Sequence, residues 1–292
     1  MFQIKFPVIR LIFAYYITES GEITSIHKLH INLLKLFIDK FKIKDFIITI
    51  DDTENIESIE KHKNYIISNL GNDINIFIEK NDKFNREGII YYKYVISKLN
   101  EYSTNNELLF FGHLKGISND DMNNTIKWVS LMYYFNLFYS YDAIDKLYNY
   151  QKEDYSKYIC YGTIYHFHNI ESISKYGWMY MGSFHWLNSS RLFNYMNENN
   201  IDINFLACGD RLRTCAETFL PNIFDNTHVA FLHDEWYNKN HNPLQYDSPD
   251  ISYKEIEYCA LLYMDYDTIV SYFDFFDKYI MNNNDFFSIN TS

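Results

Sequence analysis

Two kinds of segment alternate along the first half of the chain. Short runs of apolar residues, typical of strands buried on both faces, occupy residues 8–17, 45–50, 74–78 and 107–111. Apolar residues at helical spacing occupy residues 26–41, 54–70, 85–102 and 122–150. Strand and helix therefore alternate four times, which predicts an α/β fold with a mostly parallel sheet flanked by helices.

The second half of the chain is less regular and predicts a mixture of strand and helix. Short strand-like pieces fall at residues 159–165 and 178–186, a helix at 189–196, and a strand followed by a helix in the aromatic segment 252–280. Only 4 Pro and 9 Gly are present in 292 residues, so a flexible linker has few places to lie. We expect a single domain over residues 1–292.

Composition and charge exclude several classes of protein. With 47% hydrophobic and 22% charged residues, the chain can bury a full core, so a collagen-like or disordered chain is excluded. The 38 acidic residues outnumber the 26 basic ones and give a formal charge of −12, which would repel a phosphate backbone. We therefore expect no nucleic-acid partner.

Cysteines and apolar runs indicate the compartment. The four cysteines form no C-x-x-C pair, which argues against a zinc ribbon or a disulfide scaffold. The run at residues 6–17 is too short to span a bilayer and contains Arg10, while the stretch 259–280 is interrupted by four aspartates. We expect a soluble, cytoplasmic protein without a transmembrane segment or a signal peptide.

Ligands of parallel α/β sheets bind at the carboxyl ends of the strands, near a switch in strand order. Three predicted loops lie there: Thr18-Glu19, Asp51-Asp52 and residues 113–116. The Asp51-Asp52 pair could accept hydrogen bonds from a ribose or a base, although Asp52 is also suited to cap the next helix. In the third loop, two glycines allow a tight bend that brings Lys115 to a diphosphate, and the alternative is a solvated surface turn.

Two later segments could also carry chemistry. The segment 182–186 places a Trp and a His beside a Gly-Ser bend, which suits either a sugar-binding platform or core packing. In a helix, Arg213 and Glu217 would share one face, which suits either a general base held by a guanidinium or a structural ion pair. The irregularly spaced His228, His233 and His241 are more typical of solvated loops than of a metal site.

Several of these features occur in the order found in one group of proteins. The sequence carries Glu87, then His113-Leu114-Lys115-Gly116, Trp128, Tyr134-Phe135, Tyr161-Gly162, Gly182-Ser183-Phe184-His185-Trp186, Arg213 and Glu217-Thr218-Phe219. In this order the chain resembles glycosyltransferase-like proteins with a GT-A-type nucleotide-sugar-binding fold, known from bacterial surface-polysaccharide clusters and some large viruses. The likeness covers roughly residues 8–224. It departs from the group's pattern at Leu114, Ser183 and His185, which replace Thr, Asn and Trp.

The resemblance implies a transferase that moves a sugar from a nucleotide-diphosphate donor to a hydroxyl acceptor on a glycan or glycoconjugate. It implies a nucleotide-binding half at about 1–150, an acceptor half at about 151–225 and an extension at about 226–292. The implied roles are nucleoside binding for Asp51 and Asp52, diphosphate binding for His113 and Lys115, sugar or acceptor binding for Gly182, Ser183, His185 and Trp186, and catalysis for Glu217 oriented by Arg213.

The need for a metal and the activity itself stay open at this point. Many GT-A enzymes hold Mn or Mg with an Asp-x-Asp motif, and this chain has Gly-His-Leu-Lys-Gly at the corresponding place, so a metal is compatible with the sequence but not implied by it. One alternative is a non-catalytic nucleotide- or glycan-binding protein with the same fold. Another is a structural or assembly protein that uses the aromatic segment 253–276 as an interface.

Overall fold

The computed structural model gives the fold of most of the chain. It describes residues 7–50, 56–80, 93–114, 122–148, 155–162, 165–167, 176, 178–180, 184–201, 219–231 and 266–281. Within these ranges lie nine strands, β1 to β9, and the helices that cover them.

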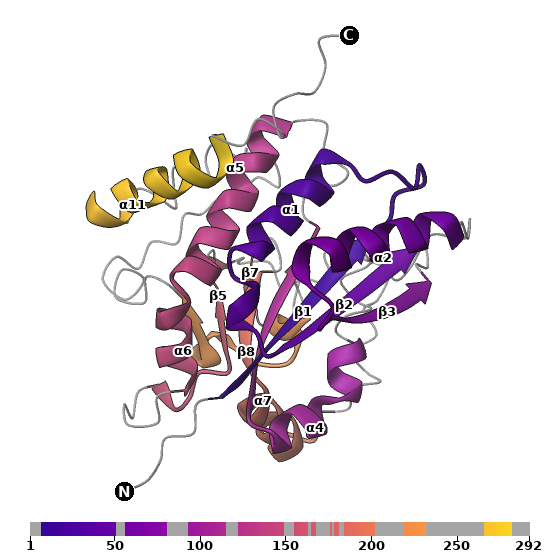
Figure 1. Ribbon diagram of the computed structural model, residues 1–292. Helices are drawn as coiled ribbons and strands as arrows, with labels where there is room; N and C mark the ends of the chain where they lie inside the picture. The colour runs from indigo at the N-terminus through magenta and orange to yellow at the C-terminus, as the bar shows by residue number, and fades with distance from the viewer. Residues whose placement is uncertain are drawn as a thin grey trace, which may run out of the picture.

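A seven-stranded sheet forms the centre of the molecule (Figure 1). Its strands are β1 (Val8–Tyr16), β2 (Ile43–Ile50), β3 (Asn75–Lys80), β4 (Glu107–His113), β5 (Cys160–Gly162), β8 (His185–Asn188) and β9 (Val229–Phe231). They are arranged in the order β3-β2-β1-β4-β8-β5-β9, and only β8 runs antiparallel to its neighbours. A separate two-stranded sheet pairs β6 (Tyr165–Phe167) with β7 (Trp178–Tyr180). The predicted α/β architecture with a mostly parallel sheet is confirmed.

Helices cover both faces of this sheet. The α-helices are α1 (Ser25–Lys35), α2 (Ile56–Leu70), α4 (Leu99–Thr104), α5 (Met122–Tyr133), α6 (Ser140–Tyr148), α7 (Ser189–Glu198) and α11 (Tyr266–Phe276). The shorter turns are η1 (Ile38–Lys40), η2 (Tyr134–Phe138), η6 (Leu220–Asn222), η7 (Asn226–His228) and η8 (Asp277–Met281). Helices α1, α2 and α5 pack on one face and α4 and α7 on the other (Figure 1).

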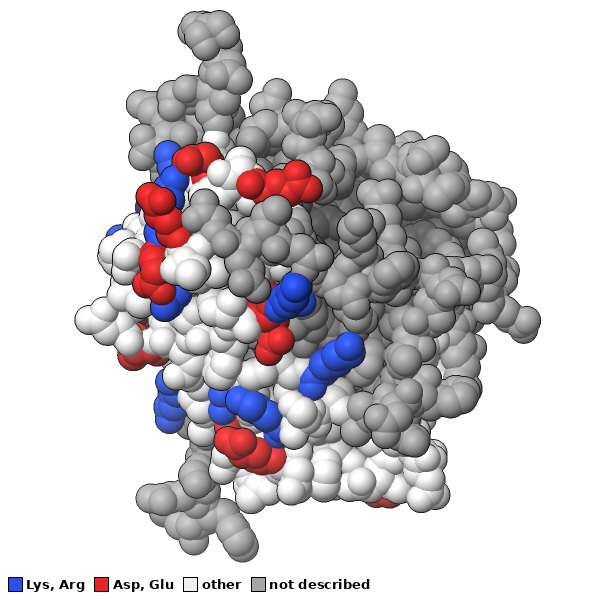
Figure 2. Space-filling view, turned by 90° about the vertical axis from the view of Figure 1, so that its right-hand side faces the viewer, with Lys and Arg blue, Asp and Glu red and all other residues white. Residues whose placement is uncertain are grey.

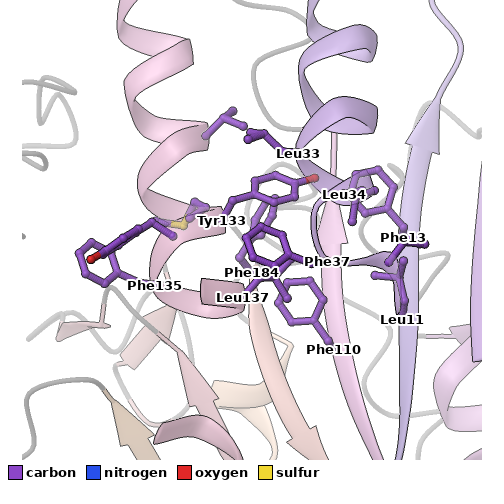
Figure 3. Close-up of a cluster of buried hydrophobic side chains, with 14 of the residues drawn as sticks. Leu11, Phe13, Leu33, Leu34, Phe37, Phe110, Tyr133, Phe135, Leu137 and Phe184 are labelled. Carbon is purple, nitrogen blue, oxygen red and sulfur yellow. The ribbon is translucent and has the colours of Figure 1, made fainter. Parts of the chain in front are cut away.

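Strand β1 shows why the apolar runs are continuous. Its side chains alternate between the two faces, so Leu11, Phe13 and Tyr15 enter the core under α1 and α2, while Ile12 and Ala14 enter the core under α4 and α7. Figure 3 shows the first of these cores, in which Phe13 and Phe110 from the sheet meet Leu33, Leu34 and Phe37 from the α1 region and Tyr133 from α5. Both faces must be apolar because both are covered.

Two of the predicted helices are shorter than the sequence indicated. The helical spacing over 26–41 covers α1 and a separate 3-10 turn, because the chain leaves the α conformation at Phe37, whose φ is −124°. The stretch predicted over 122–150 is divided into α5, the π-helical turn η2 and α6. The π turn coincides with a buried hydrogen bond, in which Trp186 Nε1 donates to the carbonyl of Asn136 at 2.9 Å.

The C-terminal helix packs on the aromatic residues of η2. Tyr272 and Phe275 of α11 are buried, and their ring centroids lie 5.3 and 5.4 Å from that of Tyr134. The helix predicted in the segment 252–280 is therefore present as α11, while the strand predicted before it lies outside the described residues. Among the helices that the structure describes, none combines the length and the apolar character needed to cross a bilayer.

Candidate functional site

The carboxyl ends of β2, β1 and β4 lie side by side at one edge of the sheet. In the strand register Ala14 of β1 pairs with Ile47 of β2 on one side and with His113 of β4 on the other. Since neighbouring strands lie about 4.8 Å apart, Ile47 and His113 are separated by about 10 Å across β1. The chain runs outward from β1 to β2 and β3 and then returns to β4 on the other side of β1. This edge is therefore the switch point of the strand order, where ligands of such sheets bind.

Two residues, His113 and Lys115, are predicted from the sequence to bind a diphosphate at this edge, and the structure describes His113. It is the last residue of β4 and is half-buried, and its ring centroid lies 5.8 Å from that of Phe184. Beyond it, the amide of Leu114 donates to the carbonyl of Ala14 at 3.1 Å. This bond holds the chain against β1 up to the residue that precedes Lys115.

Gly112 allows the end of β4 to approach the neighbouring rings. A Cβ atom at this position would lie 3.0 and 3.1 Å from two atoms of the Phe13 ring and 3.4 Å from the Phe184 ring. The two distances to Phe13 are tighter than ordinary van der Waals contact, so a side chain at this position would require the Phe13 ring to shift by a few tenths of an ångström. From the sequence we expected this glycine to allow a bend in the loop. In the structure it lies within β4, and its missing side chain leaves room for the Phe13 ring.

The loop between β1 and α1 forms the adjacent part of the edge. Ile17 donates its amide to the carbonyl of Thr49 at 3.1 Å, and a turn is closed by the bond from the Gly21 amide to the Thr18 carbonyl at 2.8 Å. Gly21 has a φ of +65°, and a Cβ atom there would lie 2.1 Å from Ser58 Oγ of α2. The turn thus requires glycine twice, for its left-handed backbone and for its contact with α2.

The buried side chain of His27 is hydrogen-bonded to residues at both ends of this loop. Its Nε2 donates to the carbonyl of Tyr16 at 2.9 Å, and its Nδ1 accepts from the amide of Thr24 at 3.1 Å. That pattern assigns the neutral imidazole with its proton on Nε2. Burial lowers the pKa of His27 to about 4, so the ring stays neutral at physiological pH.

A second buried histidine lies against the first. The ring of His62 on α2 has its centroid 4.8 Å from that of His27, and its Nδ1 is hydrogen-bonded to the hydroxyl of Tyr15 at 2.7 Å. Burial lowers the pKa of His62 to about 4 and raises the pKa of Tyr15. Neither histidine is exposed, so the pair positions the loop and does not contact a ligand directly.

Neither histidine belongs to the site residues predicted from the sequence. Their signal is present in retrospect: His62 follows Ser58 and precedes Ile66 and Leu70 at intervals of four, the spacing of the buried face of α2. His27 occupies the third position after the cap residue Thr24, where Glu or Gln would be the usual capping-box residue.

Most of the predicted site residues lie outside the part of the chain that the structure describes. These are Asp51, Asp52, Lys115, Gly182, Ser183, Arg213 and Glu217. In the sequence, Asp51 directly follows the last residue of β2, and Lys115 directly follows Leu114. The structure therefore brings the residues that precede these two side chains to the same edge of the sheet.

His185 and Trp186 were expected to contact a sugar or an acceptor, and both are core residues in the structure. They are 1% and 0% exposed. The His185 ring stacks on Phe111 with centroids 4.8 Å apart, and burial lowers its pKa to about 3. Trp186 lies against Phe41 and Phe110, with centroid distances of 6.4 and 5.0 Å. Neither side chain presents a face to a ligand, and the core packing that the sequence also allowed accounts for both.

The described part of this edge offers a half-buried imidazole and a glycine turn, and it holds no metal-binding cluster. Within the described ranges, no group of three or more His, Cys, Asp or Glu side chains is placed to hold a metal ion. Ligands of parallel α/β sheets bind at such an edge, and the residues that directly follow Ile50 of β2 and Leu114 lie outside the described ranges. A comparison of the sequence with known protein families and with curated proteins found no match.

Proposed function

We propose that the chain is a glycosyltransferase that moves a sugar from a nucleotide-diphosphate donor to a hydroxyl acceptor on a glycan or glycoconjugate. The observation that supports this most directly is the adjacency of the carboxyl ends of β2, β1 and β4 at the switch point of the sheet. The parallel β3-β2-β1-β4 half, continued by the mixed strands β8, β5 and β9, is compatible with the GT-A-type fold that the resemblance implies.

In this proposal the donor lies along the edge of the sheet. Asp51 and Asp52 after β2 bind the nucleoside, because carboxylates accept hydrogen bonds from ribose hydroxyls and base N–H groups. His113 and Lys115 after β4 bind the diphosphate, whose negative charge grows as the bond to the sugar breaks. A divalent metal is not required by these roles.

The acceptor is activated by residues from the second half of the chain. Glu217, held by Arg213, takes the proton from the attacking hydroxyl if the reaction inverts the anomeric centre. The acceptor oxygen then forms a bond to the anomeric carbon while the bond from that carbon to the diphosphate oxygen breaks, and the nucleoside diphosphate leaves with the electron pair. Gly182 and Ser183 complete the sugar or acceptor pocket in this proposal.

Donor binding can be tested separately from transfer. A thermal-shift screen with nucleoside diphosphates and nucleotide sugars, with and without manganese, should show a rise in the melting temperature for at least one of them, because a ligand that binds only the native state stabilises it. His113→Ala should reduce that rise, whereas the matched control His228→Ala, next to the amino end of β9, should not. No rise with any donor would contradict the proposal.

Transfer is tested with the best donor and a panel of glycan acceptors. Glu217→Gln keeps the size of the side chain and removes the base, so it should lower kcat by about 100-fold or more while donor binding is retained. The control is Glu198→Gln, which makes the same change at an exposed position at the end of α7. Full activity in the Glu217 variant would exclude that residue as the base.

A further inference from the structure

A pocket opens at the amino ends of the strands, whereas the candidate donor site lies at their carboxyl ends. It has a volume of about 610 Å³, which is within the range of small-molecule sites. It lies at the amino ends of β1, β2 and β3, beside the segment that leads into α4. The lining residues that define its floor and wall include Arg10, Asp45, Asn75, Phe77, Tyr94 and Lys98.

The floor of the pocket is a set of buried polar groups that hold one another in place. Asp45 is fully buried, and its carboxylate accepts from Arg10 Nη1 at 2.7 Å, from the Tyr94 hydroxyl at 2.8 Å and from Asn75 Nδ2 at 2.8 Å. Three donors converge on one carboxylate, so its charge is already neutralised and its oxygens are occupied. The floor therefore favours neither a cation nor an anion and is rigid before any ligand arrives.

The wall of the pocket is aromatic and carries a hydrogen-bond donor. The rings of Phe77 and Tyr94 lie with centroids 4.9 Å apart, and the ammonium of Lys98 lies 4.8 and 4.2 Å from these two centroids. Lys98 Nζ also donates to the Tyr94 hydroxyl at 2.9 Å. An ammonium has three N–H groups, so this lysine can donate to a ligand hydroxyl that lies against the aromatic rings.

The charges that line the pocket balance. Three basic residues (Arg10, Lys42 and Lys98) face three acidic ones (Asp45, Asp73 and Glu101). Strand β3 and helix α4 lie on the right-hand side of Figure 1, and Figure 2 shows that basic and acidic side chains are interspersed among the described residues of that side. A phosphorylated ligand would require an excess of positive charge, so the balance favours a neutral ligand with many hydroxyl groups.

We propose that this pocket binds a short, neutral saccharide. Aromatic rings pack against the apolar face of a sugar, while the Lys98 ammonium and the exposed side chains of Asn72 and Glu101 exchange hydrogen bonds with its hydroxyls. The pocket lies at the edge of the sheet opposite to His113, so a saccharide bound here occupies a second site and not the place of the donor. The inference does not depend on catalysis at the carboxyl edge.

The test is binding of a panel of neutral mono- and disaccharides, measured by calorimetry and by saturation-transfer NMR on the full chain. At least one should bind, and Phe77→Ala and Lys98→Met should each weaken it by about tenfold. The control is Ile78→Ala, which changes the next residue of the same strand, on the opposite face of the sheet and 41% exposed. His113→Ala should leave this binding unchanged. Unfolding curves of all variants verify that they are folded.

Three results would overturn the inference. The first is that no saccharide of the panel binds. The second is that binding is equal in Phe77→Ala, Lys98→Met and the Ile78→Ala control. The third is that only His113→Ala abolishes binding, which would assign the saccharide to the carboxyl edge. Saccharide binding that depends on Phe77 but occurs without transfer activity would support this inference and count against the proposed function, so the two proposals can fail separately.

Discussion

The buried ion triad under the pocket gives the sharpest prediction on stability. Arg10 donates through Nε to Glu107 at 2.6 Å, through Nη2 to the same carboxylate at 3.1 Å, and through Nη1 to Asp45 at 2.7 Å. The three side chains are 8%, 1% and 0% exposed, and the guanidinium carbon also lies 4.4 Å from the centroid of the Tyr102 ring. We consider the substitution Arg10→Met, which keeps most of the volume and removes the charge.

The expected loss follows from what the substitution leaves behind. Two carboxylates remain buried, and their other hydrogen bonds, such as the one from Asn75 to Asp45, come from neutral groups. Removing one partner of a buried ion pair costs about 3–5 kcal/mol, because an uncompensated charge stays in the interior. That is a large part of the free energy of unfolding of a typical domain, about 5–15 kcal/mol.

Urea unfolding at pH 7, followed by circular dichroism, measures this loss. The triple variant Arg10→Met, Asp45→Asn, Glu107→Gln removes all three charges together and should recover most of the stability lost in the single variant. Lys61→Met is the matched control, because the Lys61–Glu22 pair is just as short, at 2.6 Å, but exposed, and its loss should change little. The reasoning is refuted if Arg10→Met costs no more than Lys61→Met, or if the neutral triple variant is as unstable as the single one.

Two further predictions concern the loop after β1. Gly21→Ala should destabilise the fold by about 2 kcal/mol or more, because it combines a φ of +65° with a Cβ only 2.1 Å from Ser58 Oγ, and wild-type stability in urea unfolding would contradict this. The pKa of His27 and of His62 is about 4 in the folded chain against 6.5 unfolded, so stability should be full above pH 6.5 and fall as the pH drops toward 4. Unfolding at pH 5 should cost about 2 kcal/mol less per histidine than at pH 7.5, and His62→Gln should reduce that difference.

The core of the sheet could be predicted from the sequence because strands buried on both faces leave a strong signal. The run from Val8 to Ile17 and the run ELLFF from Glu107 to Phe111 are continuous apolar segments, and they became the adjacent central strands β1 and β4. Strand direction leaves no such signal. The antiparallel course of β8 depends on the path of the chain between Gly162 and His185, which side-chain periodicity does not encode.

Helix ends were predicted well where the backbone required a special residue and poorly where it did not. Gly71, with a φ of +102°, stops α2 where the sequence placed the stop. The end of α1 has no such residue, and the apolar spacing continues through Phe37, Ile38 and Phe41, because the 3-10 turn buries these side chains in the same core. The spacing of apolar residues indicates which side chains are buried, and in this segment the buried side chains continue beyond the last residue of α1.

The difference between burial and function also limits what can be concluded from the glycosyltransferase resemblance proposed from the sequence. Five of its aromatic positions, Trp128, Tyr134, Phe135, Tyr161 and Trp186, are at most 3% exposed, so core packing alone accounts for them, whether or not the chain binds a sugar. Their burial is explained by packing and gives no evidence about function. Evidence about function has to come from residues that packing does not require, and for the proposed donor site those are the polar groups that follow β2 and β4. A variant at His113 is therefore more informative than one at Trp186: the first can change donor binding in a folded protein, while the second removes the donor of a buried hydrogen bond to Asn136 and would report mainly on stability.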